Sequence, residues 1–422
     1  MSGVGPEPAV TRGLGLGPQI YDRPVSPQDV FSDLVGQDEP VRILRRAAAA
    51  AARTMAGDPD PGGMTHAWIF TGPPGARRAV AARAFAAALQ CERDGIGCGE
   101  CHGCHTTMVG THADVHVVAT EGLSIGVKET RMLVLRSASA PSGSRWQVVI
   151  VEDADRLGER ASNALLKAIE EPSPRTVFLL CTPSVHPDDI MVTIRSRCRL
   201  VSMIQPSAAA LSEFLVRRHG MVPEQAGWAA AAAQGDLERA RQLAADPESR
   251  GRRDEVLGVP RRLTNIGACF EAATKLEAAT KLEAASAVAD LDVAERSALE
   301  RALGAGGTGR GATSAMRGAA GQLKELERNQ KARATRAQRD AIDRALQDLV
   351  GFYRDVLVTS MRAPVAMVHG DLAAVTSAAA EKWAPESTLR RLEAVLACRD
   401  SIDRNVKPQV ALEAMMVTLW RG

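Results

Sequence analysis

Five short apolar runs, separated by longer stretches with helical patterning, constrain the fold of this chain most strongly. Between Phe31 and Met203 the sequence contains the strings HAWIF, DVHVV, QVVIV, TVFLL and CRLVSM in that order. Near-continuous apolar strands that alternate with helices are typical of a parallel sheet covered on both faces. The sequence therefore predicts an α/β domain with a parallel sheet over residues 27–205.

The strand pattern stops after Pro206. We expect a small domain of short amphipathic helices over residues 206–258, with Gly220 and Gly235 as breaks, and an all-helical domain over residues 259–422. The repeated hexapeptide EAATKL in the last domain fits neither a heptad nor a solenoid period, so it predicts helix and no function. The Gly/Pro-rich segments at 1–26 and 304–312 are expected to be a flexible tail and a flexible loop.

Composition narrows the class of protein. The chain has 422 residues, of which 45% are hydrophobic and 24% are charged, as in globular proteins. It has no hydrophobic signal core and no apolar run of the roughly 18–20 residues that a membrane span requires, so we expect a cytoplasmic protein. The net charge of +2 is too close to neutral to predict nucleic-acid binding by itself.

Four of the eight cysteines form the pattern C-x6-C-x2-C-x2-C, namely Cys91, Cys98, Cys101 and Cys104. Four thiolates with interleaved glycines match a closed, tetrahedral zinc site in a reducing compartment. An iron–sulfur run would need a further cysteine where Met108 stands. His102 and His105 could replace a thiolate, but four cysteines suffice, so we expect both histidines to be exposed neighbours of a structural zinc.

The string TGPPGARRA resembles a phosphate-binding loop that has lost its chemistry. Gly72 and Gly75 keep the turn, but Arg77, Arg78 and Ala79 stand where G-x-x-x-x-G-K-[ST] requires glycine, lysine and a hydroxyl. Ala79 cannot bind magnesium, and an arginine is a larger, planar substitute for the lysine ammonium. An ordinary turn between a strand and a helix is the competing interpretation.

Two further strings contain candidate functional residues, an acidic pair and an arginine. QVVIVEDADRL ends a strand with Glu152 and Asp153, the place where phosphate-loop enzymes hold magnesium and a water, although the order of the acids is reversed. TIRSRC places Arg197 directly before the last strand, where a surface salt bridge is the simplest role. Each string alone is compatible with a purely structural role.

Taken together, these strings resemble one family, the clamp-loader subunits of bacterial DNA polymerase III in the AAA+ class. The resemblance is dense over residues 31–203 and loose in the helical remainder. It is carried by VGQDEPVRIL, TGPPG, the four-cysteine module, GTHADVHVV, VVIVEDADRL, NALLKAIEEP, FLLCTPS and SRC. It implies an AAA+ domain with an inserted zinc module, then a helical lid domain and a helical collar domain for oligomerisation.

The resemblance also implies roles for residues. The delta-prime branch of the family lacks a working loop yet keeps Ser-Arg-Cys, which here is Ser196, Arg197 and Cys198. Arg197 would then act in trans, as an arginine finger in the ATP site of a neighbouring motor subunit. Thr182 occupies the sensor position after its strand, and at the second sensor position Glu238 replaces the expected arginine.

As partners, the resemblance implies motor subunits of the gamma/tau type, a delta-type subunit and, through the complex, the sliding clamp and primed DNA. The chain would belong to a DNA-directed DNA polymerase (nucleotidyltransferase) assembly and would not itself hydrolyse ATP. Two other functions remain open. The first is an active AAA+ ATPase in which Arg78 replaces the lysine. The second is a zinc-stabilised module that binds nucleic acid through the basic helix Lys324 to Arg344. A solvated helix face is the simpler explanation of that basic helix.

Overall fold

The computed structural model describes residues 29–58, 62–93, 96–120, 124–141, 145–303 and 312–422. The expected tail at 1–26 and nearly all of the expected loop at 304–312 lie outside these ranges. The five predicted strands are present and form one parallel sheet, as the sequence predicts for an α/β domain, in the order β2-β3-β4-β1-β5. The strands are β1 (Ala67–Thr71), β2 (Val115–Val118), β3 (Gln147–Val151), β4 (Thr176–Thr182) and β5 (Arg199–Ser202).

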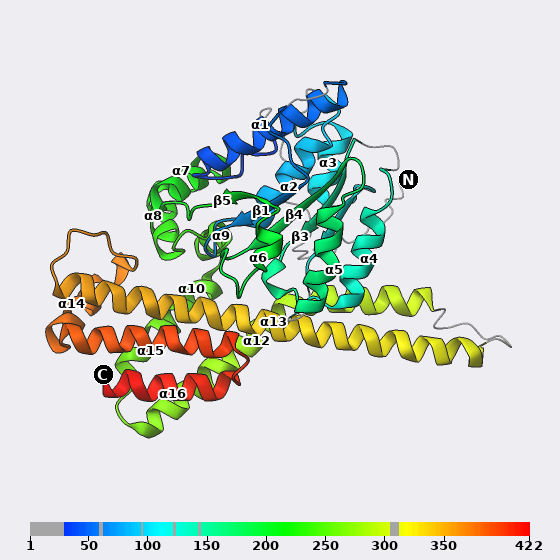
Figure 1. The fold of residues 1–422 in the computed structure, drawn as a ribbon. Helices are drawn as coiled ribbons and strands as arrows, with labels where there is room; N and C mark the ends of the chain where they lie inside the picture. The colour runs from blue at the N-terminus through cyan, green and yellow to red at the C-terminus, as the bar shows by residue number, and fades with distance from the viewer. Residues whose placement is uncertain (1–28, 59–61, 94–95, 121–123, 142–144, 304–311) are drawn as a thin grey trace, which may run out of the picture.

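Helices cover both faces of this sheet, as Figure 1 shows. Side chains alternate between the faces, so that Trp68 and Phe70 of β1 lie in one core while Ile69 lies in the other. The first core lies under α1 and α2, and the second under α4 and α5. The helices of this part are α1 (Asp38–Met55), α2 (Arg78–Leu89), α3 (His102–Val109), α4 (Val127–Ser137), α5 (Glu159–Glu170) and α6 (Val192–Arg195), with a 3-10 turn η2 (Ala154–Arg156).

The remainder of the described chain is helical, as the sequence predicts. Gly220 adopts a left-handed conformation with φ of 62° and ends α7, and Gly235 has φ of 88° between α8 and α9. The short helices are α7 (Ala208–His219), α8 (Pro223–Ala232), α9 (Leu237–Ala245), α10 (Pro247–Leu257) and α11 (Val259–Arg262). The last group is α12 (Ile266–Ala302), α13 (Ala312–Ser360), η3 (Gly370–Leu372), α14 (Ala373–Lys382), α15 (Pro385–Asp403) and α16 (Pro408–Arg421).

The EAATKL repeat lies in α12 and shows why its period has no structural meaning. Six residues advance a helix by about 240°, so equivalent residues point in different directions. Leu276 of the first copy is 6% exposed in the core that α12 shares with α13 and α16, whereas Leu282 of the second copy is 73% exposed. The repeat therefore contributes to packing through only part of its sequence.

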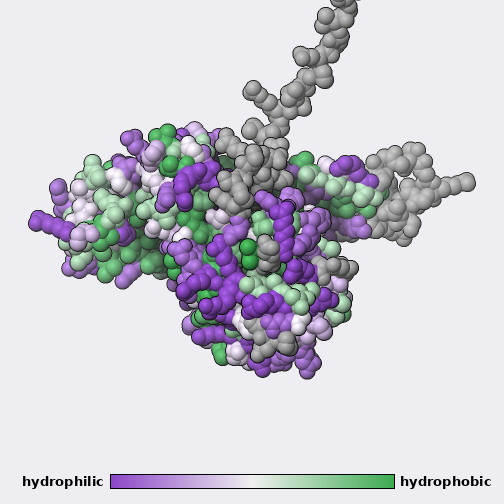
Figure 2. All heavy atoms as spheres, turned by 90° about the horizontal axis from the view of Figure 1, so that it is seen from above, coloured by the Kyte–Doolittle hydropathy of each residue, from purple (hydrophilic) through white to green (hydrophobic). Residues whose placement is uncertain are grey.

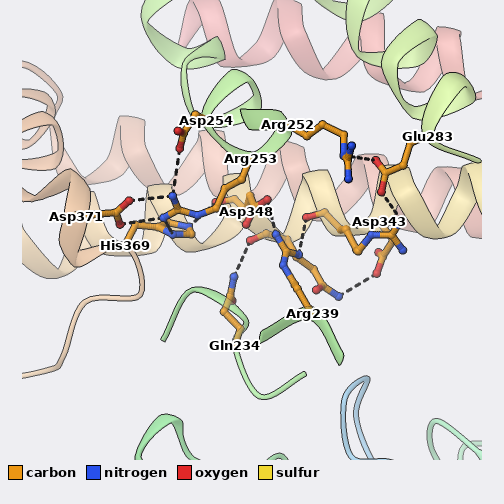
Figure 3. A network of polar contacts seen from close by, with 12 residues as sticks. Gln234, Arg239, Arg252, Arg253, Asp254, Glu283, Asp343, Asp348, His369 and Asp371 are labelled. Carbon is orange, nitrogen blue, oxygen red and sulfur yellow. Dashed lines mark hydrogen bonds and ion pairs between the residues drawn. The ribbon is translucent and has the colours of Figure 1, made fainter. Parts of the chain in front are cut away.

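A network of polar contacts joins the short helices to α13 and the segment before η3 (Figure 3). Arg253 of α10 donates to both carboxylate oxygens of Asp371 at 2.9 Å and to Nδ1 of His369 at 2.9 Å. Nε2 of His369 lies 3.0 Å from the carbonyl oxygen of Asp348, which assigns the proton to Nε2. The imidazole is fully buried, and burial together with the nearby charge of Arg253 lowers its pKa.

This buried imidazole predicts a pH dependence of stability. In the folded chain His369 stays neutral, whereas in the unfolded chain it takes up a proton near its ordinary pKa of about 6.5. Folding stability is therefore complete above about pH 6.5 and falls as the pH drops below that value, because only the unfolded state binds the extra proton. We expect the variant His369→Gln to lose less stability than the wild-type chain when the pH is lowered from 8 to 5.5. The measurement is the urea concentration at the midpoint of unfolding at each pH. Parallel pH profiles for the two proteins would contradict this role.

Candidate functional site

The carboxyl ends of β1, β3 and β4 bring the degenerate loop and the acidic pair to one edge of the sheet. The loop has a left-handed backbone at the position where the phosphate-loop pattern has its second glycine. Arg77 has φ of 59° and ψ of 40°, a left-handed conformation that glycine adopts without strain and arginine does not. An added Cβ at Gly72 would lie 2.4 Å from the carbonyl oxygen of Met203, so this glycine is required by close packing.

Arginine side chains occupy the surroundings of this loop. The guanidinium of Arg78 bends back and donates to the carbonyl oxygen of Gly72, at the start of the same loop. Arg77 is half-buried, and burial lowers its pKa while the nearby carboxylates of Asp33 and Glu238 oppose that shift. Ala79 follows in the first turn of α2 and carries no oxygen ligand for magnesium.

The acidic pair is also bound within the chain. Glu152 forms an ion pair of 2.7 Å with Arg83 of α2. Asp153 accepts two hydrogen bonds from Arg336 of α13, at 2.8 and 3.0 Å, and Arg336 also donates to the carbonyl oxygen of Thr120. Sequence reasoning missed Arg336 because it lies 183 positions from Asp153 and no local pattern connects the two.

The two sensor positions differ in what they present to the loop: the hydroxyl of Thr182 is bound within its own turn, and Glu238 is a carboxylate near Arg77. Thr182 is the last residue of β4 rather than the residue after it, and its buried hydroxyl donates to the carbonyl oxygen of Ser184 at 2.9 Å. Glu238 is exposed at the start of α9. The adjacent Arg239 is buried and bonds Asp348 and the carbonyl oxygen of Arg344, so it faces α13.

Arg197 lies in the corner between α6 and β5, with its side chain 40% exposed. One of its nitrogens forms a 2.7 Å ion pair with Glu170, which ends α5 in the string AIEEP, and another donates to the carbonyl oxygen of Thr193 at 2.9 Å. The surface salt bridge considered from the sequence is thus present. Ser196 turns its hydroxyl to the carbonyl oxygen of Thr193, and burial raises the pKa of the half-buried Cys198 thiol to about 12.

The four predicted cysteines converge. The sulfurs of Cys91, Cys98, Cys101 and Cys104 all lie within 4.8 Å of one another, which leaves room for one ion. Backbone N–H groups point at these sulfurs at 3.4–3.5 Å, for example from Cys101 to Cys98. Burial would raise the pKa of the Cys91 thiol, but the surrounding backbone N–H groups lower it to about 6. The donor set fits a tetrahedral metal ion such as zinc.

The cysteine module is packed tightly onto the helix of the loop. Cys101 begins α3 by accepting from the backbone of Cys104, and a Cβ at Gly103 would lie 2.2 Å from the carbonyl oxygen of Gln90, directly after α2. His102 and His105 are exposed, as expected. The module therefore stabilises the position of α2 and takes no part in the loop itself.

The basic segment of α13 is largely paired within the chain. Arg333 binds Asp292 and Glu295 of α12, and Arg344 binds Glu283 at 2.7 Å. Hydrophilic and hydrophobic residues are interspersed over the face of the molecule drawn in Figure 2. The ion pairs of Arg333 and Arg344 disfavour the interpretation that this helix binds the phosphates of a nucleic acid.

Among the described helices, none has the length and apolar character of a membrane span.

Comparison with known proteins agrees with this architecture. Residues 49–207 match the family model described as DNA polymerase III, delta subunit. The chain is 40% identical over 157 residues to DNA polymerase III subunit delta′ of Pseudomonas aeruginosa, which covers 36% of this chain and 47% of that relative. Over these residues the chain is similar to a delta′ subunit.

Other relatives include both delta′ and tau subunits of DNA polymerase III. The chain is 38% identical over 119 residues to DNA polymerase III subunit delta′ of Haemophilus influenzae, covering 28% of this chain and 36% of the relative. It is 33% identical over 171 residues to DNA polymerase III subunit tau of Bacillus subtilis, covering 40% and 28%. The chain thus spans less than half the length of these relatives. The match to the family model, residues 49–207, includes the loop, the acidic pair and Arg197.

Proposed function

We propose that this chain is a delta-prime-type clamp-loader subunit of a bacterial DNA polymerase III holoenzyme. It does not hydrolyse ATP and instead supplies Arg197 to the ATP site of an adjacent motor subunit of the gamma/tau type. A delta-type subunit, the sliding clamp and primed DNA are its further partners through the complex. The observation that carries the proposal is a contrast: arginines of the chain itself occupy its nucleotide-type site, while Arg197 is exposed.

The chemistry of Arg197 suits action in trans. A guanidinium keeps its charge and offers planar donors that match phosphate oxygens, so it stabilises negative charge that builds during phosphoryl transfer. Its ion pair with Glu170 is exposed on both sides, at 40% and 39%, and exposed pairs are weak enough to be exchanged for a stronger anion. Val192 and Leu200, on the elements that flank Arg197, are 58% and 42% exposed and supply apolar contact for a partner.

Each of the three proposed domains has its own part in this function. Residues 27–205 form the AAA+ domain that presents Arg197, residues 206–258 the lid domain, and residues 259–422 the collar domain that joins the other subunits. Zinc is the proposed cofactor, and it would hold residues 91–104 against α2. Arg336 links the collar domain to Asp153 of the AAA+ domain, and Arg239 of the lid domain binds Asp348 of the collar domain. These contacts support a rigid arrangement of the three domains.

An active AAA+ ATPase is the alternative, and a rebuilt loop tests it. We expect the purified chain to hydrolyse ATP at background rate, and the triple variant Arg77→Gly, Arg78→Lys, Ala79→Thr to gain less than about tenfold. The reason is that Glu152 and Asp153 stay paired with Arg83 and Arg336, so magnesium and water remain unpositioned. The measurement is phosphate release with and without primed DNA.

Two further variants separate a true activity from contamination. Turnover by the wild-type chain that disappears in Glu152→Gln and in Asp153→Asn would establish an intrinsic ATPase and overturn the proposal. Turnover that is equal in all variants comes from another protein in the preparation. Copurification with motor, delta-type and clamp proteins tests the assembly independently.

A further inference from the structure

The segment before α1 lies against two parts of the chain that are far apart in sequence. Residues 29–37, which we call the strap, form turns between the described start of the chain and α1. One end of the strap contacts the cysteine module. The other end contacts the helices α7 to α9 and the connection that leads into them from β5. The strap therefore connects the cysteine module with these helices.

At its first end the strap is bonded to the cysteine module. The N–H group of Val30 donates to the carbonyl oxygen of Gly97 at 2.9 Å. Gly97 directly precedes Cys98 and has φ of 86°, and a Cβ on it would lie 2.5 Å from a methyl group of Val30. Val30 and Phe31 are 7% and 2% exposed, in the same core as three of the cysteines, namely Cys91, Cys101 and Cys104. An ion bound by the cysteines would therefore fix the backbone that holds this end of the strap.

At its other end the strap packs on the helices α7 to α9. Val35 lies against the separate hydrophobic core that these helices form. The buried amide of Gln37 donates to the carbonyl oxygen of Ile204 at 2.5 Å and accepts from its N–H group at 3.1 Å, between β5 and α7. Asp33 forms an ion pair of 3.8 Å with Arg218 of α7. These contacts fix the position of α7 relative to the strap.

The strap depends on its two ends for its conformation. Arg45 of α1 also pairs with Asp29, and its guanidinium lies 5.8 Å from the centre of the Phe31 ring. The Arg45 side chain is 51% exposed, and exposed ion pairs contribute little to stability. Turns lack the hydrogen-bond ladders of helices and strands, so a segment of this kind opens locally when its side-chain contacts are lost. A change at one end of the strap is therefore transmitted to the other.

We propose that the strap couples zinc binding at the four cysteines to the packing of α7 to α9. When an ion holds the cysteines, Gly97 keeps Val30 in place and the strap presents Val35 to the core of these helices. When the ion is absent, the strap is released at its first end and the contacts at its other end weaken. Such a coupling is reciprocal, so the contacts of Val35 must raise the affinity for zinc. The inference rests on zinc binding by the cysteines and not on the clamp-loader function.

Two matched valine variants of the full chain test the reciprocal effect. Val35 of the strap and Val216 of α7 are both half-buried and pack against the same core. Val35→Ala should weaken zinc binding by about three-fold, because it removes only part of a coupling whose usual size is about five-fold or more. Val216→Ala should bind zinc as the wild-type chain does. The measurement is equilibrium competition for zinc with EDTA, followed by metal analysis of the protein.

Three results of this competition would overturn the proposal. They are wild-type zinc affinity in Val35→Ala, an equal loss of affinity in Val216→Ala, and no zinc binding by the wild-type chain.

Hydrogen exchange of the wild-type chain tests the effect of zinc on the helices. Removal of zinc by EDTA should accelerate exchange in α7 by about ten-fold, and by a larger factor than in α5, which packs in the second core of the sheet. In Val35→Ala the response of α7 to zinc should shrink, whereas in Val216→Ala it should persist. Unchanged exchange in α7 would overturn the coupling. Equal acceleration in α5 and α7 would also overturn it, because the sheet domain would then unfold as a whole and release α7 without the strap.

Discussion

Replacing Arg197 with alanine is expected to lower ATP turnover at one partner site by about 10³- to 10⁵-fold, the range of arginine fingers in related phosphate-loop enzymes. The variant should fold and assemble normally. Its lost ion pair with Glu170 is exposed and contributes at most about 1 kcal/mol, and one side chain at a large interface rarely decides assembly. The measurement is DNA-stimulated ATP hydrolysis and clamp loading by a reconstituted loader. Clamp loading is the sharper readout, because the other ATP sites draw on other subunits.

Neighbouring variants make this test specific. Arg197→Lys should restore little activity, because an ammonium lacks the planar pair of donors. Arg195→Ala is the matched control: it removes an exposed arginine two positions away, whose guanidinium donates to the carbonyl oxygen of Val185 at 3.5 Å, and it should load clamps normally. Clamp loading at the wild-type rate by Arg197→Ala would mean that this arginine is only structural.

Local patterns in the sequence were sufficient to predict the sheet. The strands β1, β3 and β4 are short runs of residues that are buried on both faces, and such a run needs no information from distant parts of the chain to be recognised. The helix breaks at Gly220 and Gly235 were predictable for the same reason, since the left-handed backbone at both positions favours glycine. The cysteine cluster was predictable because its ligands lie within one short segment.

The state of the nucleotide-type site was not predictable in this way. The sequence indicates that the loop has lost its lysine and hydroxyl, but the contact of Asp153 with Arg336 joins two regions of the chain that are far apart in sequence. The direction of Arg239, toward α13 rather than toward the loop, depends on the same packing of helices. Tertiary packing thus decides whether an acidic residue at a strand end is available to magnesium. The spacing of residues in the motif does not contain this information.

The cysteine cluster gives the second large effect. We expect one zinc ion per chain, and Cys101→Ser should lose it and destabilise the sheet domain severely. Structural zinc in small modules contributes on the order of 10 kcal/mol to folding, and here the module is continuous with the first core of the sheet domain. Cys101 also begins α3, which packs on α2, so the loop and α2 should lose protection together. The measurements are metal analysis by mass spectrometry and hydrogen exchange resolved by segment.

The helical part of the chain provides an internal reference for the zinc prediction. Helices α12 to α16 share a separate core, so their hydrogen exchange should change little in Cys101→Ser. Cys398→Ser is the matched variant: it replaces another buried thiol by a hydroxyl, in that helical core, and should keep one zinc per chain because it lies outside the cluster. Iron in place of zinc, no metal in protein purified under reducing conditions, or full zinc content in Cys101→Ser would each contradict a structural zinc at this site.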